Sequence, residues 1–174
     1  MRWKKGILVA DAPHILYLED STGDGKADIR KIILTGFAVS NAQMNVSNPL
    51  YGLDNWIYLT SESGSTYQIY KKEFGDLGSD IIFPDQPNAP RLPLKGSGRT
   101  VRFRPDEREL ELTSGKTQFG HAFDNWGHHI LGNNSNHIYH EVVAEPYLKR
   151  NPDLLVSSAT QTLTDHGSEV FPIT

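Results

Sequence analysis

The stretch TQFGHAFDNWGHHILGNNSNHIYH, residues Thr117 to His140, carries the pattern that indicates the fold. It holds five of the seven histidines, one of the three tryptophans and a run of amide side chains. Within it, Trp126 opens a strand–turn–strand unit that ends 14 residues later at His140. The stretch is too polar for a core strand and too aromatic for a linker, so we expect it to shape a binding surface.

The same unit occurs two more times along the chain. Trp3 precedes Tyr17 by 14 residues, and Trp56 precedes Tyr70 by the same distance. Short or alternating apolar runs bounded by Gly, Asn, Asp and Pro surround these positions, as is typical of strands and turns. The expected strands are GILVAD (6–11), HILYLE (14–19), KIILTGF (31–37), WIYLT (56–60), YQIYKK (67–72), TVRFRP (100–105), HHILG (128–132) and HIYHEVV (137–143). Only 144–152 suggests a helical turn, which ends at a proline.

These units predict an all-β chain that forms a partial β-propeller, with about three blades of a longer ring. Hairpins opened by an aromatic residue and recurring every 53 and then 70 residues fit propeller blades. The expected units lie near 3–37, 54–115 and 124–174, and a Gly- and Pro-rich loop insertion at 74–98 lengthens the second. Because a ring needs about four to eight blades, segment 1–174 belongs to a longer protein or pairs with copies of itself. A β-sandwich is the alternative.

The composition excludes several classes of function. The 174 residues suit one domain, and 37% hydrophobic residues suffice for a core. A formal net charge of −4 without any basic run argues against nucleic acid as a partner. The absence of cysteine excludes disulfides, thiolate zinc sites and CxxCH haem attachment within these residues. No run of about 18 apolar residues occurs, so we expect no transmembrane segment here.

Residues 20–28, DSTGDGKAD, are the strongest candidate metal site. Oxygen ligands occupy relative positions 1, 3, 5 and 9, and Gly25 at position 6 allows a tight turn. Position 12 is Lys31 instead of the Glu of an EF-hand, and the flanks are strands. We therefore predict a structural calcium loop in a β-hairpin, and a solvated turn without metal is the alternative. The expected ligands are Asp20, Thr22, Asp24, the carbonyl of Lys26, and Asp28.

The histidines of the opening stretch lack the spacing of a metal site. Adjacent His128 and His129 would face opposite sides of a strand, and so would His137 and His140. A polar funnel that binds a ligand fits this stretch, and so does a set of ordinary hydrogen-bonded loop residues.

The segment Thr164-Asp165-His166-Gly167 has a different character. An Asp–His pair before a glycine can present an imidazole on a loop, where it can serve as a base near pH 7. A solvent-facing histidine in a turn is an equally good interpretation.

A series of motifs links the chain to a known family. They are VADAPHILYLED (9–20), GDGKAD (23–28), LTGF (34–37), the scattered Asn41, Gln43, Val46, Ser47 and Pro49, GLDNWIY (52–58), VRFRPD (101–106), SGKTQFG (114–120), FDNWG (123–127), NSNHIYH (134–140), YLKRNP (147–152), DHG (165–167) and VFPI (170–173). Over nearly its whole length the chain resembles the membrane-bound dehydrogenase domain of planctomycete- and verrucomicrobia-type haem-binding proteins. These are β-propellers related to sorbosone and soluble quinoprotein glucose dehydrogenases.

The resemblance implies a sugar or alcohol dehydrogenase that passes electrons to a cytochrome c-like module carrying haem outside this chain. It also implies a periplasmic, secreted or envelope-associated location in bacteria. The chain departs from the family pattern at Asn48, where members often have His, at Asn55, where they have Gly, and at Gly132, where Cys is common. If the missing His is a catalytic base, activity would be lost.

We therefore expect a segment of a quinoprotein-like dehydrogenase, with calcium and pyrroloquinoline quinone as cofactors. A histidine base would take the hydroxyl proton of the substrate while hydride leaves to the quinone. His166 with Asp165 is the expected catalytic pair. The sugar or polyol is expected near Gln43, Asn48, His121, His137 and His140, and quinone carboxylates near Arg99, Arg102 and Arg104. The alternative is a non-catalytic, calcium-stabilised propeller that binds a carbohydrate or protein.

Overall fold

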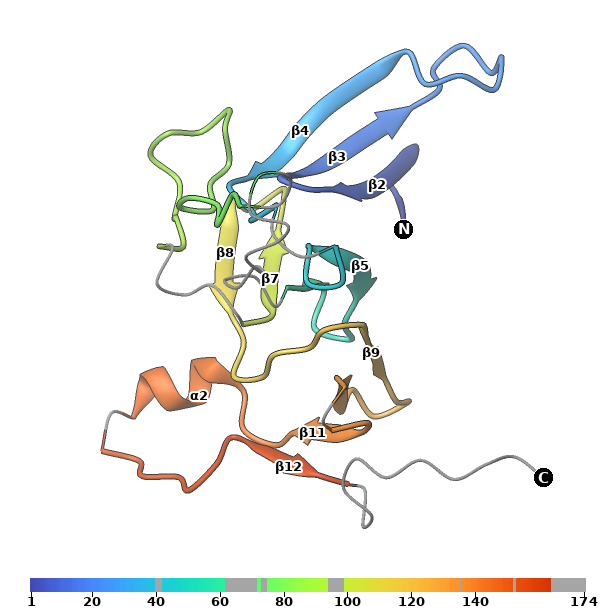
Figure 1. Cartoon of the computed structure of the whole chain (residues 1–174). Coiled ribbons are helices and arrows are strands. Elements are labelled where there is room, and N and C mark those ends of the chain that lie inside the picture. The colour runs from blue at the N-terminus through green and yellow to red at the C-terminus, as the bar shows by residue number, and fades with distance from the viewer. Residues whose placement is uncertain are drawn as a thin grey trace, which may run out of the picture.

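Three four-stranded antiparallel sheets follow one another along the chain in a computed structural model (Figure 1). The structure describes residues 1–39, 42–61, 72, 75–93, 99–134, 136–151 and 153–163. The prediction of an all-β chain is confirmed. Among the described elements the only helix is α2 (Glu145–Arg150), and no described helix is long and apolar enough to cross a membrane.

Each sheet is a meander in which strands adjacent in sequence are adjacent in space. The first sheet contains β1 (Arg2–Trp3), β2 (Gly6–Asp11), β3 (His14–Glu19) and β4 (Ile29–Thr35). The second contains β5 (Ser47–Tyr51), β6 (Ile57–Thr60), β7 (Val101–Arg104) and β8 (Glu109–Leu112). The third contains β9 (Gly120–Phe123), β10 (His129–Gly132), β11 (Tyr139–Glu141) and β12 (Thr160–Thr162). The sheets thus span 2–35, 47–112 and 120–162.

The hairpin expected to start at Trp56 has a different partner strand. Tyr58 in β6 pairs with Leu50 in β5 on one edge and with Arg102 in β7 on the other. Both edges of β6 are therefore occupied, and the expected partner YQIYKK (67–72) lies outside the described residues except for its last residue. The prediction of a hairpin between these two runs is wrong, because β6 pairs with a strand much further along the chain.

The three tryptophans lie in or next to the connection between the first and second strands of each sheet. Trp3 ends β1, Trp56 directly precedes β6, and Trp126 lies between β9 and β10. Trp3 and Trp56 are buried, whereas Trp126 is 80% exposed. Each turn also contains a residue with a positive φ angle: Lys4 (52°), Asn55 (62°) and Gly127 (85°). The tryptophan spacing therefore marks a real repeat, although the third tryptophan remains at the surface.

One hydrophobic core joins the first and second sheets. Its members include Leu8, Ile15, Leu34, Ile57, Leu59, Val101 and Phe103. Leu131 and Tyr139 of the third sheet are buried but are not part of this cluster. The contact between the second and third sheets therefore relies on polar and aromatic groups, and the candidate site lies there.

The insertion predicted as a loop at 74–98 contributes to this core. Its described part, 75–93, forms isolated bridges, such as Thr35 with Ile82 at the end of β4. Phe83 is 1% exposed and belongs to the core cluster. A Cβ atom on Gly36, which has φ of 107°, would lie 2.2 Å from the carbonyl oxygen of Asp80, so only glycine permits this close approach. The insertion is irregular, but it is packed.

Replacing Phe83 with alanine should lower the free energy of unfolding by about 3–5 kcal/mol, because it leaves a cavity in the core. Urea unfolding followed by tryptophan fluorescence measures the change. The matched control is Phe119→Ala at a phenylalanine that is 54% exposed, with an expected change within about 0.5 kcal/mol. Equal losses in the two variants would contradict a core role for the insertion.

Candidate functional site

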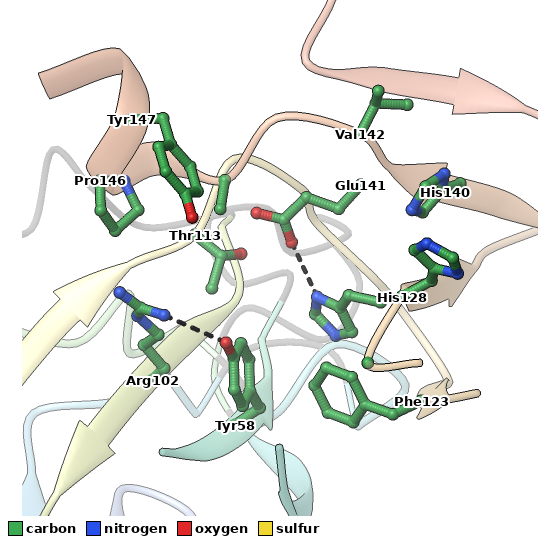
Figure 2. A pocket seen from close by; sticks show the side chains of 13 residues that line it. Tyr58, Arg102, Thr113, Phe123, His128, His140, Glu141, Val142, Pro146 and Tyr147 are labelled. Atoms are coloured by element: carbon green, nitrogen blue, oxygen red, sulfur yellow. Dashed lines mark hydrogen bonds and ion pairs between the residues drawn. The ribbon is translucent and has the colours of Figure 1, made fainter. Parts of the chain in front are cut away.

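A pocket of about 530 Å³ lies between the second and third sheets (Figure 2). The second sheet supplies β6 and β7 to its walls, the third supplies β9, β10 and β11, and α2 forms a further side. Its lining includes the aromatic residues Tyr58, Phe123 and Tyr147 and the histidines His128, His129 and His140. We call this space the inner pocket.

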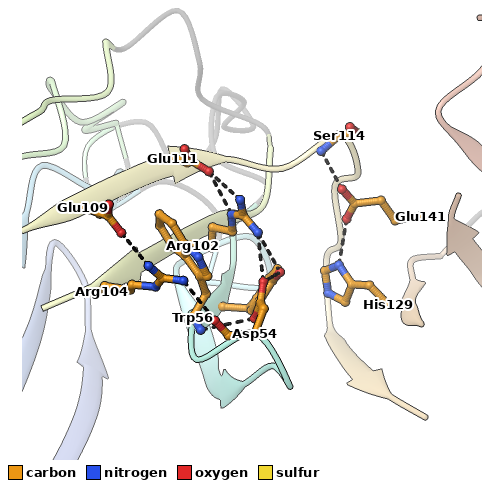
Figure 3. A network of polar contacts seen from close by, with 10 residues as sticks. Asp54, Trp56, Arg102, Arg104, Glu109, Glu111, Ser114, His129 and Glu141 are labelled. Atoms are coloured by element: carbon orange, nitrogen blue, oxygen red, sulfur yellow. Dashed lines mark hydrogen bonds and ion pairs between the residues drawn. The ribbon is translucent and has the colours of Figure 1, made fainter. Parts of the chain in front are cut away.

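A buried series of hydrogen bonds, the histidine–glutamate chain, runs behind the inner pocket. His121 Nδ1 lies 2.8 Å from His129 Nε2, and His129 Nδ1 lies 2.7 Å from Glu141 Oε2. At one end, His121 Nε2 is 2.8 Å from the carbonyl oxygen of Asn48 in β5. At the other end, the backbone N–H of Ser114 donates to Glu141 Oε1 at 2.9 Å (Figure 3). The histidine–glutamate chain thus connects the third sheet to β5 of the second sheet at one end and to the segment after β8 at the other.

Hydrogen-bond roles fix most of the protons in this chain. The carbonyl of Asn48 can only accept, so His121 donates from Nε2 and accepts from His129 at Nδ1. One further proton lies between His129 Nδ1 and Glu141, which makes the pair either imidazolium with carboxylate or two neutral groups. Burial lowers the pKa of His121 to about 4, against the opposing effect of the Asn48 hydrogen bond, so His121 is neutral at pH 7.

The histidine–glutamate chain also supports the aromatic wall of the inner pocket. The ring of His129 stacks on Phe123 with centroids 4.7 Å apart and planes at 13°. Tyr58 packs against both rings, at 4.9 Å from Phe123 and 5.0 Å from His129. Since both nitrogens of His129 are engaged, this residue orients its neighbours and has no free nitrogen for a ligand.

An arginine network forms the opposite wall (Figure 3). Arg102 lies 3.0 Å from Asp54 and 2.6 Å from Glu111, and its guanidinium is 4.2 Å from the ring centre of Trp56. It also donates to the hydroxyl of Tyr58, whose pKa is raised because burial outweighs the effect of Arg102. Tyr58 therefore stays protonated.

The three arginines expected near quinone carboxylates already have carboxylate partners. Besides Arg102, Arg99 pairs with Glu145 at 2.6 Å and Arg104 with Glu109 at 3.0 Å. A guanidinium that is committed to a protein carboxylate cannot bind a cofactor carboxylate in the same way. These residues do not fit the quinone that the family resemblance implies.

An Asp–His pair lies at the edge of the inner pocket. His128 Nδ1 donates to Asp124 Oδ2 at 2.7 Å, which leaves the lone pair of its Nε2 free of this bond. Burial acts to raise the pKa of Asp124, but hydrogen bonds from His128 and from the N–H of Trp126 outweigh burial and lower it. The ring of His140 packs edge-on against His128 at 5.1 Å.

The structure brings some of the predicted site residues together. Asn48 and His121 are in direct contact through two hydrogen bonds, and His140 lines the inner pocket.

Other predicted site residues lie elsewhere. His137 lines a separate hollow of about 380 Å³, which Phe119 also lines. Gln43 lies in the turn before β5 and lines neither space. His129, the first residue of β10, is buried, and His128, which directly precedes the strand, is exposed. The predicted catalytic pair Asp165 and His166 lies outside the described residues.

The predicted calcium loop is closed by its own hydrogen bonds. The carboxylate of Asp20 accepts backbone N–H groups from four residues, Thr22, Gly23, Asp24 and Gly25. Asp28 accepts from the backbone and hydroxyl of Ser21, and these bonds lower the pKa of both aspartates. In the part of the chain that the structure describes, no three His, Cys, Asp or Glu side chains converge to hold a metal.

The sequence interpretation missed several important residues, chiefly Tyr58, Phe123, Glu141 and Tyr147. For Glu141 the sequence did carry a signal. A hairpin centred near residue 135 places Glu141 opposite His129, and the structure has this register. The other residues come from distant segments, so no local pattern relates them.

Stability should depend on pH through His121. Its pKa is about 4 in the folded protein against an ordinary value of 6.5, so the unfolded chain binds more protons between these values. Lowering the pH from 6.5 to 4 should therefore remove about 3 kcal/mol of stability. Urea unfolding across this range measures the slope. His121→Gln, which retains a donor and an acceptor but does not titrate, should flatten it, and an unchanged slope would contradict this assignment.

Comparison with known proteins adds a family but no characterised relative. No curated protein matches the chain, and no solved structure matches it either. The sequence profile of a domain of unknown function, DUF7133, matches residues 1–174. Since this match covers the whole sequence, the chain belongs to the DUF7133 family.

Proposed function

We propose that the chain is a segment of a β-propeller that binds a sugar or polyol in the inner pocket. Three successive four-stranded meanders with a common tryptophan turn support the propeller arrangement. A closed ring needs more sheets than these, so further blades would come from a longer protein or from other copies. The proposed location is periplasmic, secreted or envelope-associated.

The observation that carries this proposal is the combination of aromatic faces and imidazoles in one small space. A volume of about 530 Å³ is in the range of small-molecule sites. Tyr58, Phe123 and Tyr147 offer flat apolar surfaces for the C–H faces of a sugar ring. His128 and His140 offer hydrogen-bonding nitrogens for its hydroxyl groups.

Oxidation of the bound alcohol is the second candidate, and the Asp124–His128 pair favours it. His128 Nε2 would accept the hydroxyl proton, while Asp124 holds the ring and stabilises its charged form. Hydride would leave to a quinone cofactor such as pyrroloquinoline quinone, held by residues other than Arg99, Arg102 and Arg104, and a haem module elsewhere in the longer protein would take the electrons. Turnover of the bound sugar with an artificial electron acceptor, measured on that longer protein, would distinguish oxidation from binding alone.

Replacing Tyr147 with alanine should weaken sugar binding about tenfold, because it removes an aromatic face from the pocket. Isothermal titration calorimetry with a panel of monosaccharides and polyols measures the affinity. The matched control is Tyr51→Ala, which removes a tyrosine on β5 that is 45% exposed and does not line the pocket. Equal affinity in both variants, or no binding to any panel member, would overturn the proposal.

We also propose calcium as a ligand of the Asp20–Asp28 loop. The spacing of its oxygens and the positive φ of Gly25, 84°, support a loop that can wrap one ion.

Calcium at 100 times its dissociation constant should then raise the free energy of unfolding by about 2.7 kcal/mol. Thermal unfolding with and without calcium measures the gain. Asp24→Ala should abolish the gain in stability that calcium gives, and Asp153→Ala should preserve it. An equal gain in both variants would exclude this loop as the calcium site.

A further inference from the structure

A second hollow extends the inner pocket towards the surface. It encloses about 510 Å³ and shares Tyr58, Arg102, Phe123 and Tyr147 with the inner pocket. Its own lining includes Leu53, Trp56, Trp126 and Arg150. Because the two spaces share these lining residues, they adjoin each other, and we call them the inner and outer compartments of one groove.

The outer compartment has an exposed aromatic platform in Trp126. This side chain is 80% exposed, while the other two tryptophans at equivalent turns are buried. The turn that holds it is well defined, because Asp124 Oδ1 accepts the N–H groups of Trp126 and His128, each at 2.9 Å. Tyr147, 62% exposed, also faces this compartment. Large exposed aromatic side chains on an ordered turn are a feature of binding surfaces.

Polar groups accompany these aromatic faces. Asp54 is 40% exposed at its side chain and lines the outer compartment together with Arg102 and Arg150. A sugar unit needs both a flat apolar surface below its ring and hydrogen-bonding groups around its edge. The outer compartment supplies both, as the inner pocket does.

We propose that the groove binds an oligosaccharide, with one sugar unit in the inner pocket and the next unit stacked on Trp126. This inference rests on the proposed sugar-binding function and adds its ligand class, a chain of at least two units. Two adjoining compartments that share Tyr58, Phe123 and Tyr147, with histidines added in the inner one and Trp126 in the outer one, suit two linked rings. The inner unit contacts the histidines, and the outer unit contacts Trp126 and Tyr147.

The test compares glucose with linear glucose oligomers of two to four units, both α-linked and β-linked, by calorimetry. One of the oligomer series should bind about fivefold or more tightly than glucose, and Trp126→Ala should remove this gain while leaving the affinity for glucose unchanged. Trp126→Phe should retain part of the gain. Phe119→Ala, an exposed aromatic residue that does not line the groove, should retain all of it.

Intrinsic fluorescence gives an independent measurement, since Trp126 is the one exposed tryptophan of the three. Oligomers that bind should change the emission of the parent protein more than that of Trp126→Phe, in which buried Trp56 is the tryptophan that lines the outer compartment. Equal affinity for glucose and both oligomer series would overturn the oligosaccharide inference and preserve the sugar-binding function. No binding of any sugar would overturn both, and a gain that persists in Trp126→Ala would overturn the role of Trp126.

Discussion

The junction between the second and third sheets depends on the buried histidine–glutamate chain. The hydrophobic core does not extend across this junction, and hydrogen bonds between Asn48 and His121 and between Ser114 and Glu141 take its place. Buried polar groups destabilise a protein unless each finds a partner, and every side-chain nitrogen and oxygen of His121, His129 and Glu141 has one. The loss of one of these three residues would leave the next one without its hydrogen-bond partner. The geometry of the junction therefore depends on the complete histidine–glutamate chain.

This junction also determines the character of the inner pocket. Both walls contain ionisable groups, but each is paired inside the protein, Arg102 with Asp54 and Glu111, and His129 with Glu141. A charged ligand would have to compete with these pairs, whereas a neutral ligand can use the aromatic faces and the remaining hydrogen-bonding groups. Such walls suit a polyhydroxylated, uncharged molecule better than an acid or an amine.

Local patterns in the sequence predicted several strands but not β5, β9 or β12, and they predicted the long-range pairings poorly. Short apolar runs bounded by turn residues identified β2 and β3 with correct bounds, because such a run and its boundaries are visible within a few residues. Nothing local indicated that β6 pairs with β7 across residues 61–100. The same limit applied to the site, where Asn48 and His121 were anticipated, while Tyr58 and Phe123 were not, because the pocket walls come from two different sheets.

The helix α2 is the least anchored side of the inner pocket. None of its residues is buried, and the ion pair between Arg99 and Glu145 joins it to the segment before β7. The other two sides are fixed by the arginine network and the histidine–glutamate chain. Pro146 and Tyr147 face the pocket from this helix, so a ligand there would pack against apolar surface that solvent now covers. Ligand binding and the position of α2 should therefore be coupled, because the helix would gain the packing that the protein alone does not give it.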